Sequence, residues 1–244
     1  MFRSYLKSLY KRTMEEAYSL AFKEIADSLI NGGCCLDCGA QEGDSFNRIN
    51  DYITMDKSQY NGIEWNEEVV HNAQIKGIRI VCGDLNSKLP FEDEQFRCVF
   101  GLSVLEHLLN GCSFMRECHR VLEKGGKLIL LTPNISTYFT IALLLMGKMP
   151  SSGPHPDSNA LITKEEIYKV SDYNLIHDAE SEKPIARHLV VFSYRVLRRY
   201  LSMIGFSEIC GYGFGLYPFP IFMQPILEKL DPYHCHQMVF VAKK

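Results

Sequence analysis

Acidic residues and glycines follow short apolar runs at several points in the first half of this sequence. In the first case Asp37 ends the apolar run at 34–37, and Gly39 and Gly43 come after it. Glycine lets the backbone approach a ligand closely and adopt positive φ. A helix that starts after such a turn offers free N–H groups to an anionic group such as a carboxylate. The pattern Asp-x-Gly-x-x-x-Gly therefore predicts a turn that binds a small ligand.

Two further acids, Glu64 and Asp84, follow later apolar runs. An acid at the end of a second strand is placed to accept hydrogen bonds from ribose hydroxyls. Asp84 precedes Leu85 and Asn86, and this amide-containing loop could meet an adenine amino group. Solvated acids and turn glycines would account for each feature alone. Their order, each at the exit of a successive predicted strand, favours a nucleotide-like ligand.

Strands and helices alternate between these residues. Apolar runs bounded by turn signals predict strands, and apolar residues at helical spacing predict helices. The predicted strands cover 34–37, 60–64, 78–82, 96–100 and 127–131, and the predicted helices cover 67–76, 106–122 and a segment that begins near Asp44 or Ser45, both good N-caps. Such alternation is typical of a parallel sheet with helices on both faces. Ligands of these sheets bind beyond the carboxyl ends of the strands.

The flanking segments complete one predicted domain over residues 1–244. Further helices are predicted at 4–29, 135–149, 164–170 and 193–204, and two final strands at 206–212 and 238–242. We divide the chain into N-terminal helices at 1–30, a nucleotide-binding half at 31–134, a variable lid or acceptor region at 135–192, and a closing helix with strands at 193–244. The apolar segment 138–146 is expected to be an ordinary buried helix, with a lid or a membrane-surface contact as the alternative.

Composition limits the classes of partner. The net charge is -3, so no nucleic acid partner is expected. The nine cysteines stand mostly inside predicted strands and helices, which favours a reducing cytoplasm. No secretory signal is expected, because charges interrupt the first twenty residues, and no apolar run approaches the roughly 20 residues of a membrane span. No metal site is predicted: Cys35 and Cys38 lack a second pair, and neighbours in the extended segment 234–236 point to opposite faces.

Five segments together resemble the motifs of the class I, type 11-like S-adenosylmethionine (SAM) dependent methyltransferases. They read LDCGAQEGDSF, NGIEWNEEVV, VCGDLNSKLPFEDEQF, VFGLSVLEHL and HRVLEKGGKLILLTPN. The resemblance extends over roughly residues 30 to 244. It implies a Rossmann-like α/β fold with a seven-stranded, mostly parallel sheet whose last strand is antiparallel, with helices on both faces.

The resemblance also implies a cofactor site for SAM. The first motif would line the methionine side of SAM, the acid of the second would hold the ribose, the third would flank adenine, and the fourth would lie near the transferring methyl. The implied cofactor-binding residues are Asp37, Cys38, Gly39, Ala40, Gln41, Gly43, Glu64, Trp65, Asp84, Leu85, Asn86, Gly101, Leu102 and Ser103.

The chain departs from the family pattern at a few positions. Gln41 stands where the middle glycine of the first motif is usual, and a glutamine there is expected to strain a positive-φ turn. Arg97 stands where an aspartate usually starts the fourth strand, and Leu102 replaces a frequently polar residue. These departures keep a degenerate, non-catalytic partner protein open as an alternative. A NAD-dependent oxidoreductase is a further alternative, disfavoured because the turn lacks Gly-x-Gly-x-x-Gly.

The predicted reaction is transfer of the activated sulfonium methyl by in-line displacement, for which the protein mainly aligns the acceptor and excludes water. An oxygen acceptor would also need a base, and His107 and His188 are the candidate catalytic residues. The acceptor is expected to be a small molecule, a lipid or a sugar. The sequence leaves the acceptor and the oligomeric state open.

Overall fold

The seven strands form one sheet in the order β3-β2-β1-β4-β5-β7-β6. A computed structural model describes residues 2–150, 152–158, 160–161 and 187–244. Strands β1 to β5 run parallel, and β7 pairs antiparallel with both β5 and β6, as predicted. The strands are β1 (Cys35–Cys38), β2 (Tyr60–Glu64), β3 (Arg79–Cys82), β4 (Phe96–Leu102), β5 (Leu122–Pro133), β6 (Ser207–Phe214) and β7 (Gln237–Lys243).

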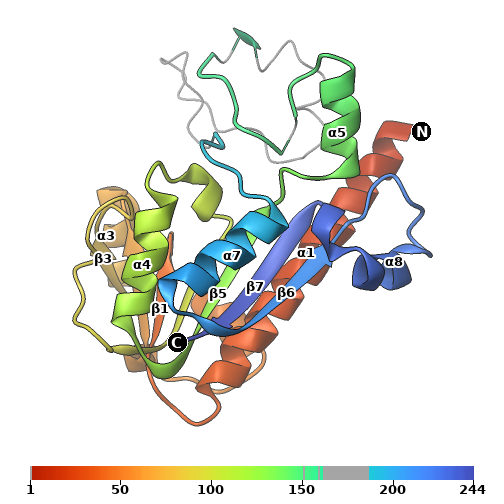
Figure 1. Cartoon of the computed structure of the whole chain (residues 1–244). Coiled ribbons are helices and arrows are strands. Elements are labelled where there is room, and N and C mark those ends of the chain that lie inside the picture. Colours follow the sequence, from red (N-terminus) through yellow and green to blue (C-terminus); the bar gives the residue numbers. More distant parts are fainter. Residues whose placement is uncertain (1, 151, 159, 162–186) are drawn as a thin grey trace.

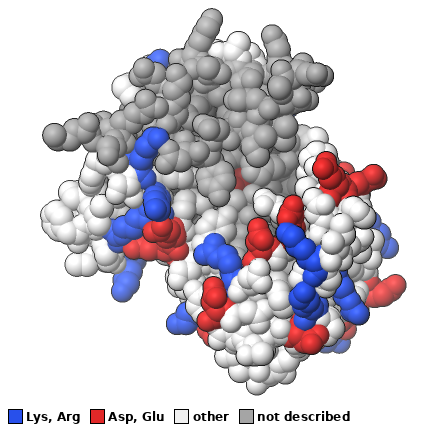
Figure 2. Space-filling model, turned by 180° about the vertical axis from the view of Figure 1, so that it is seen from behind, with Lys and Arg blue, Asp and Glu red and all other residues white. Residues whose placement is uncertain are grey.

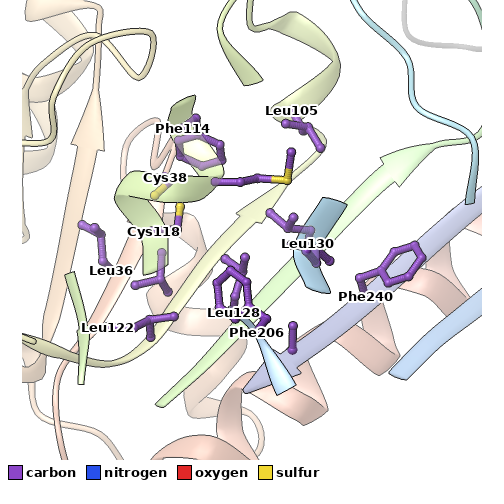
Figure 3. Packing of buried hydrophobic residues seen from close by; sticks show 14 of the residues in the cluster. Leu36, Cys38, Leu105, Phe114, Cys118, Leu122, Leu128, Leu130, Phe206 and Phe240 are labelled. Carbon is purple, nitrogen blue, oxygen red and sulfur yellow. The ribbon is translucent and has the colours of Figure 1, made fainter. Parts of the chain in front are cut away.

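The central strands are apolar on both sides, because helices cover both faces of the sheet (Figure 1). On β5, Leu128 and Leu130 point into one core and Ile129 and Leu131 into the other. Successive side chains of a strand alternate between faces, so one apolar run supplies both cores. Figure 3 shows the first core, where Phe114 and side chains of β1, β5 and β7 meet.

The helices divide between these two cores. One face is covered by α1 (Phe2–Leu29), α2 (Asp44–Asn50) and α3 (Glu67–Ile75). The other is covered by α4 (Gly111–Val121) and α7 (Tyr194–Ile204). The long helix α1 crosses β4, β5 and β7, which places the N-terminal segment over the middle of the sheet (Figure 1). The remaining described helices are α5 (Tyr138–Leu145), α8 (Gln224–Leu230), and the 3-10 turns η1 (Lys57–Gln59), η2 (Leu105–His107) and η4 (Pro232–His234).

The helix predicted over 106–122 is wrong at both ends. The chain after β4 forms the 3-10 turn η2, takes an extended conformation at Leu108, and starts α4 only at Gly111, while Leu122 begins β5. The loop after β3 fixes the start of α4, because Asn110 N–H donates to Asn86 Oδ1 at 2.9 Å. The N-cap predicted for α2 is also wrong: Gly43, at φ 85, precedes the helix without a side-chain cap.

The segment after β5 differs from its prediction as well. The helix expected at 135–149 is confined to α5, and only part of it is buried, since Leu144 and Leu145 are exposed while Leu143 is covered. Helix α8 was not predicted. The helix predicted at 164–170 lies outside the described residues. Within the described part of the chain, no helix combines the length and the apolar character needed to cross a membrane.

Candidate functional site

The carboxyl ends of β1, β2, β3 and β4 bring the predicted cofactor residues to one edge of the sheet. Parallel strands end at the same edge, so loops that are distant in sequence become neighbours there. The chain turns back at this edge through Gly39, which has φ 81. A Cβ added at Gly39 would lie 2.6 Å from Cγ2 of Val104, the residue that precedes η2. Glycine is therefore required both by the backbone angle and by the close approach of the loop after β4.

The first loop is held against the end of β2 by its own backbone. Gly39 N–H and Ala40 N–H both donate to the carbonyl of Ile63, at 2.9 and 3.1 Å. The next N–H, that of Gln41, donates to Glu64 Oε2 at 3.1 Å. The loop and the acid that sequence analysis placed on two separate strands thus form one unit.

Glu64 is buried, and its carboxylate is surrounded by backbone donors. Besides Gln41 N–H, it accepts at Oε1 from Trp65 N–H at 2.9 Å and from Asn66 N–H at 3.2 Å. A carboxylate has about four lone-pair sites, so three donors leave room for one more. A ribose hydroxyl fits this remaining requirement, because a hydroxyl donates one hydrogen bond. The residues present are therefore compatible with a nucleoside at this position.

Gln41 has φ 47, which confirms the predicted positive-φ strain at this position. We expect Gln41→Gly to change the free energy of unfolding by less than about 1 kcal/mol, because relief of strain offsets the extra freedom of the unfolded chain. Gly39→Ala in the same loop should instead destabilise the protein by about 1–3 kcal/mol, through overpacking against Val104 and the positive φ. Urea denaturation of the two variants checks this contrast. Equal losses for both variants would contradict it.

Asp37 lies at the end of β1 and is buried. The hydroxyl of Tyr60, on the neighbouring strand, donates to its Oδ2 at 2.5 Å, and the side chain of Ser45 is a second hydrogen-bond partner. Burial raises the pKa of Asp37 to about 6, since desolvation of the charged form outweighs these two hydrogen bonds. Ser45 was predicted as a possible N-cap of α2. It lies instead in the first turn of that helix, where its side chain forms a hydrogen bond with Asp37.

The loop after β3 is joined to the loop after β4. Asp84 Oδ1 accepts from the backbone N–H and the side-chain amide of Asn86, at 2.8 and 3.0 Å. Asn86 Oδ1 in turn accepts from Asn110 N–H. Leu85 is buried and Trp65 is 69% exposed. The predicted adenine-flanking residues Asp84, Leu85 and Asn86 therefore lie in one loop, in which Leu85 is buried and Asp84 is exposed.

The residues after β4 contact helix α1, which is distant from them in the sequence. Ser103, at φ 56, accepts a hydrogen bond at Oγ from the hydroxyl of Tyr18 on α1, at 3.2 Å. The ring of Tyr18 stacks on Phe22, and Arg48 lies over both rings. Tyr18 is the residue that the sequence reasoning missed here. No local pattern indicates it, because the contact joins residues that lie 85 positions apart.

His107 and His188, predicted separately, lie together with Glu106. The two imidazole rings are 5.3 Å apart, and ligand atoms of all three residues lie within 4.8 Å of one another. Glu106 was not predicted as a functional residue; its carboxylate is buried and accepts from the hydroxyl of Thr132 at 3.0 Å. Burial raises the pKa of Glu106.

The imidazole of His188 is largely shielded from solvent and lies against the rings of His107 and His155. Burial first, and then the neighbouring histidines, lower its pKa to about 3. At neutral pH the ring is therefore uncharged and has a low proton affinity.

The cysteines and histidines that sequence analysis considered for metal binding have separate surroundings. Cys35 belongs to the core under α1, and Cys38 to the core under α4. His234 bonds to Asp231 and stacks on Tyr138, whereas His236 contacts Ser152 and Tyr217. The two cysteines therefore lie on opposite faces of the sheet, and the two histidines have different hydrogen-bond partners.

Comparisons with known sequences match the part of the chain that contains β1 to β4. Residues 36–130, less than half of the chain, match the model of a family described as a methyltransferase domain. A probable S-adenosylmethionine-dependent methyltransferase of Mycobacterium tuberculosis is 31% identical over 120 residues, which are 49% of this chain and 40% of the relative. A demethylmenaquinone methyltransferase of Staphylococcus epidermidis is 31% identical over 111 residues, 38% of this chain and 44% of the relative. The chain thus spans less than half the length of either curated relative.

A comparison with solved structures extends the similarity in fold to the whole chain. A SAM-dependent methyltransferase of Thermotoga maritima, described as a possible histamine N-methyltransferase, has a TM-score of 0.56 and 16% identity. The match covers 100% of this chain and 98% of that one. Together with the sequence matches, this confirms the predicted resemblance and the predicted Rossmann-like fold.

Proposed function

We propose that this chain, which resembles the class I SAM-dependent methyltransferases in the sequence of its nucleotide-binding half and in its fold, transfers the methyl group of SAM to a small-molecule, lipid or sugar acceptor. The observation that carries the proposal is the carboxylate of Glu64. It is held by three backbone N–H groups at the exit of β2, with capacity for one further donor. That is the requirement of a ribose at the switch point of a parallel sheet.

SAM would supply an activated methyl group when bound. The loops after β1, β2 and β3 would hold it, and its sulfonium sulfur would be the leaving group for in-line transfer of the methyl to the acceptor, keeping the electron pair of the broken carbon–sulfur bond. A base such as His107, or solvent, would take the proton that an oxygen acceptor gives up. The chain's own contribution is alignment of the two reactants and exclusion of water.

Each of the predicted cofactor loops has a role in this proposal. The loop with Gly39 and Gln41 lies along the methionine part, Glu64 holds the ribose, and Asp84 with its loop flanks adenine. The residues at 101–103 lie next to the transferred methyl, where Tyr18 supports Ser103 through its hydroxyl. His107 ends η2, the turn after β4, and its ring lies against that of His188, so both are proposed to act on the acceptor.

Surface charge supports an acceptor other than a nucleic acid. Lys and Arg side chains alternate with Asp and Glu over the described part of the face in Figure 2, and the net charge of the chain is -3. A nucleic-acid partner requires a concentrated basic surface. The nine cysteines are all free, which favours the reducing cytoplasm as the compartment.

A lipid acceptor is supported by apolar side chains near the variable region. Leu145 of α5 and Phe222 before α8 are 85% and 80% exposed. The two segments are linked by the edge contact of Tyr138 with Phe219. Exposed apolar side chains of this kind contact an apolar ligand or a membrane surface.

Calorimetric titration with SAM and with S-adenosylhomocysteine tests the cofactor, with NAD as the control. We expect binding of the first two with micromolar dissociation constants and no binding of NAD. Binding of SAM without methyl transfer to any acceptor tried would favour the degenerate partner protein. Binding of NAD alone would overturn the proposal in favour of an oxidoreductase.

A further inference from the structure

We propose that Glu106, His107 and His188 bind one divalent transition-metal ion on the acceptor side of the site. Their ligand atoms lie within 4.8 Å of one another, close enough for a single ion to reach all three after small side-chain adjustments. The donor set is two imidazole nitrogens and one carboxylate oxygen. Metal ions such as Zn²⁺, Fe²⁺, Mn²⁺ and Co²⁺ bind to such sets with further coordination positions left open.

Both histidines are oriented as metal-binding histidines are. Nδ1 of His107 lies 3.0 Å from the carbonyl oxygen of Arg187, and Nδ1 of His188 lies 3.1 Å from that of Ser152. A carbonyl oxygen only accepts, so Nδ1 is the protonated nitrogen in each ring and Nε2 has the lone pair. This outer hydrogen bond fixes the tautomer and orientation of metal-ligating histidines. In both rings Nε2 is therefore the nitrogen that is available to bind an ion.

The carboxylate is held in a comparable way. The hydroxyl of Thr132, at the end of β5, donates to Glu106 Oε2 at 3.0 Å. The backbone carbonyl of Glu106 accepts from Leu189 N–H at 2.7 Å, which ties η2 to the segment that contains His188. The buried carboxylate and the two imidazole rings together supply the donor types that a divalent ion needs.

His155 belongs to the support of this site. Its ring stacks on His188 with centroids 4.6 Å apart, and its Nδ1 accepts from the backbone N–H of His188 at 3.2 Å. The Nδ1 lone pair of His155 is thereby occupied within the protein. We therefore assign it to positioning and restrict the ligands to three.

The position of the ion suggests a class of acceptor, and this step rests on the proposed function. Glu106 and His107 follow Ser103 by a few residues, so the ion would lie next to the end of β4, where the methyl group is transferred. Open coordination positions on such an ion favour oxygen donors. The acceptor would then be an oxygen nucleophile, whose hydroxyl becomes more acidic on the ion.

Titration of the metal-free protein with Co²⁺ tests the site, followed by visible absorption and by calorimetry. We expect one equivalent to bind with visible d–d bands and without the near-ultraviolet thiolate band that cysteine ligands would give. His188→Ala, His107→Ala and Glu106→Gln should each weaken binding by about 100-fold or more, and Thr132→Val by about 10–100-fold. His71→Ala, an exposed histidine on α3, is the matched control and should bind Co²⁺ as the parent does.

Unchanged Co²⁺ binding in the triple variant of the three ligands, or a thiolate band, would overturn the proposal, because the ion would then be held elsewhere. SAM calorimetry on the same proteins separates this inference from the proposed function. SAM binding retained in His188→Ala with loss of Co²⁺ supports both. SAM binding without any Co²⁺ binding to the parent removes the metal site and leaves the cofactor proposal intact.

Discussion

Glu64→Ala is expected to weaken SAM binding by about 100-fold. Loss of a hydrogen bond to a charged carboxylate costs about 1.5–3 kcal/mol, and the upper end corresponds to about two orders of magnitude in the dissociation constant. The structure adds a second cause: without the carboxylate, the N–H groups of Gln41, Trp65 and Asn66 lose their acceptor, and the loop after β1 is no longer tied to β2. Calorimetry with SAM and S-adenosylhomocysteine measures the loss.

Two further variants separate ligand binding from loop stability. Glu64→Gln keeps one acceptor oxygen but turns an amide group toward backbone donors, so we expect a loss of affinity as well, with a lowered melting temperature. Glu67→Ala removes an exposed acid from the first turn of α3 and is the matched control. Wild-type affinity for SAM in a folded Glu64→Ala protein would show that the ribose does not contact this residue.

The stability of the protein should fall as pH rises from about 4 to about 7.5 because of Asp37. Its pKa is about 6 in the folded state, and an unfolded aspartate has a pKa of about 3.9. Between these values the folded protein holds a proton that the unfolded chain has lost, so the free energy of unfolding decreases with pH. The stabilising contribution is complete below the unfolded pKa and is lost as pH passes the folded one. Two pKa units correspond to about 3 kcal/mol.

Urea denaturation of the parent and of Asp37→Asn at several pH values isolates this contribution. The free energy of unfolding of the parent minus that of the variant should fall by about 3 kcal/mol over this range. Taking the difference cancels the other titrating groups. A difference that stays constant with pH would show that Asp37 titrates normally in the folded protein.

Two conditions should change this profile in opposite directions. Tyr60→Phe removes a hydrogen bond that lowers the pKa of Asp37, so the decline should become larger and move to higher pH. Saturating SAM should weaken the decline, because the ammonium group of its methionine part would favour the charged carboxylate. The second effect depends on the proposed position of SAM, and the first does not.

The local sequence determined the central strands and the acidic residues at their ends. Strand β2 has the predicted bounds, and the other central strands were placed correctly with differences at their ends. Continuous apolar runs bounded by turn signals are typical of strands packed between two helical layers, and Asp37, Glu64 and Asp84 stand at or just after the ends of those strands. Their arrival at one edge of the sheet follows from parallel pairing alone.

Contacts between distant segments were decided only by the tertiary structure. Tyr18 reaches Ser103 because α1 packs across β4, and His188 reaches His107 because Leu189 pairs with Glu106. The start of the helix predicted at 106–122 was wrong for the same reason, since Asn86 fixes the start of α4 from another loop. Periodicity describes which face of an element is buried, whereas these contacts depend on how complete elements pack. The sequence therefore determined the positions of the candidate site residues along the chain, and only the packing of complete elements determined which of these side chains contact one another.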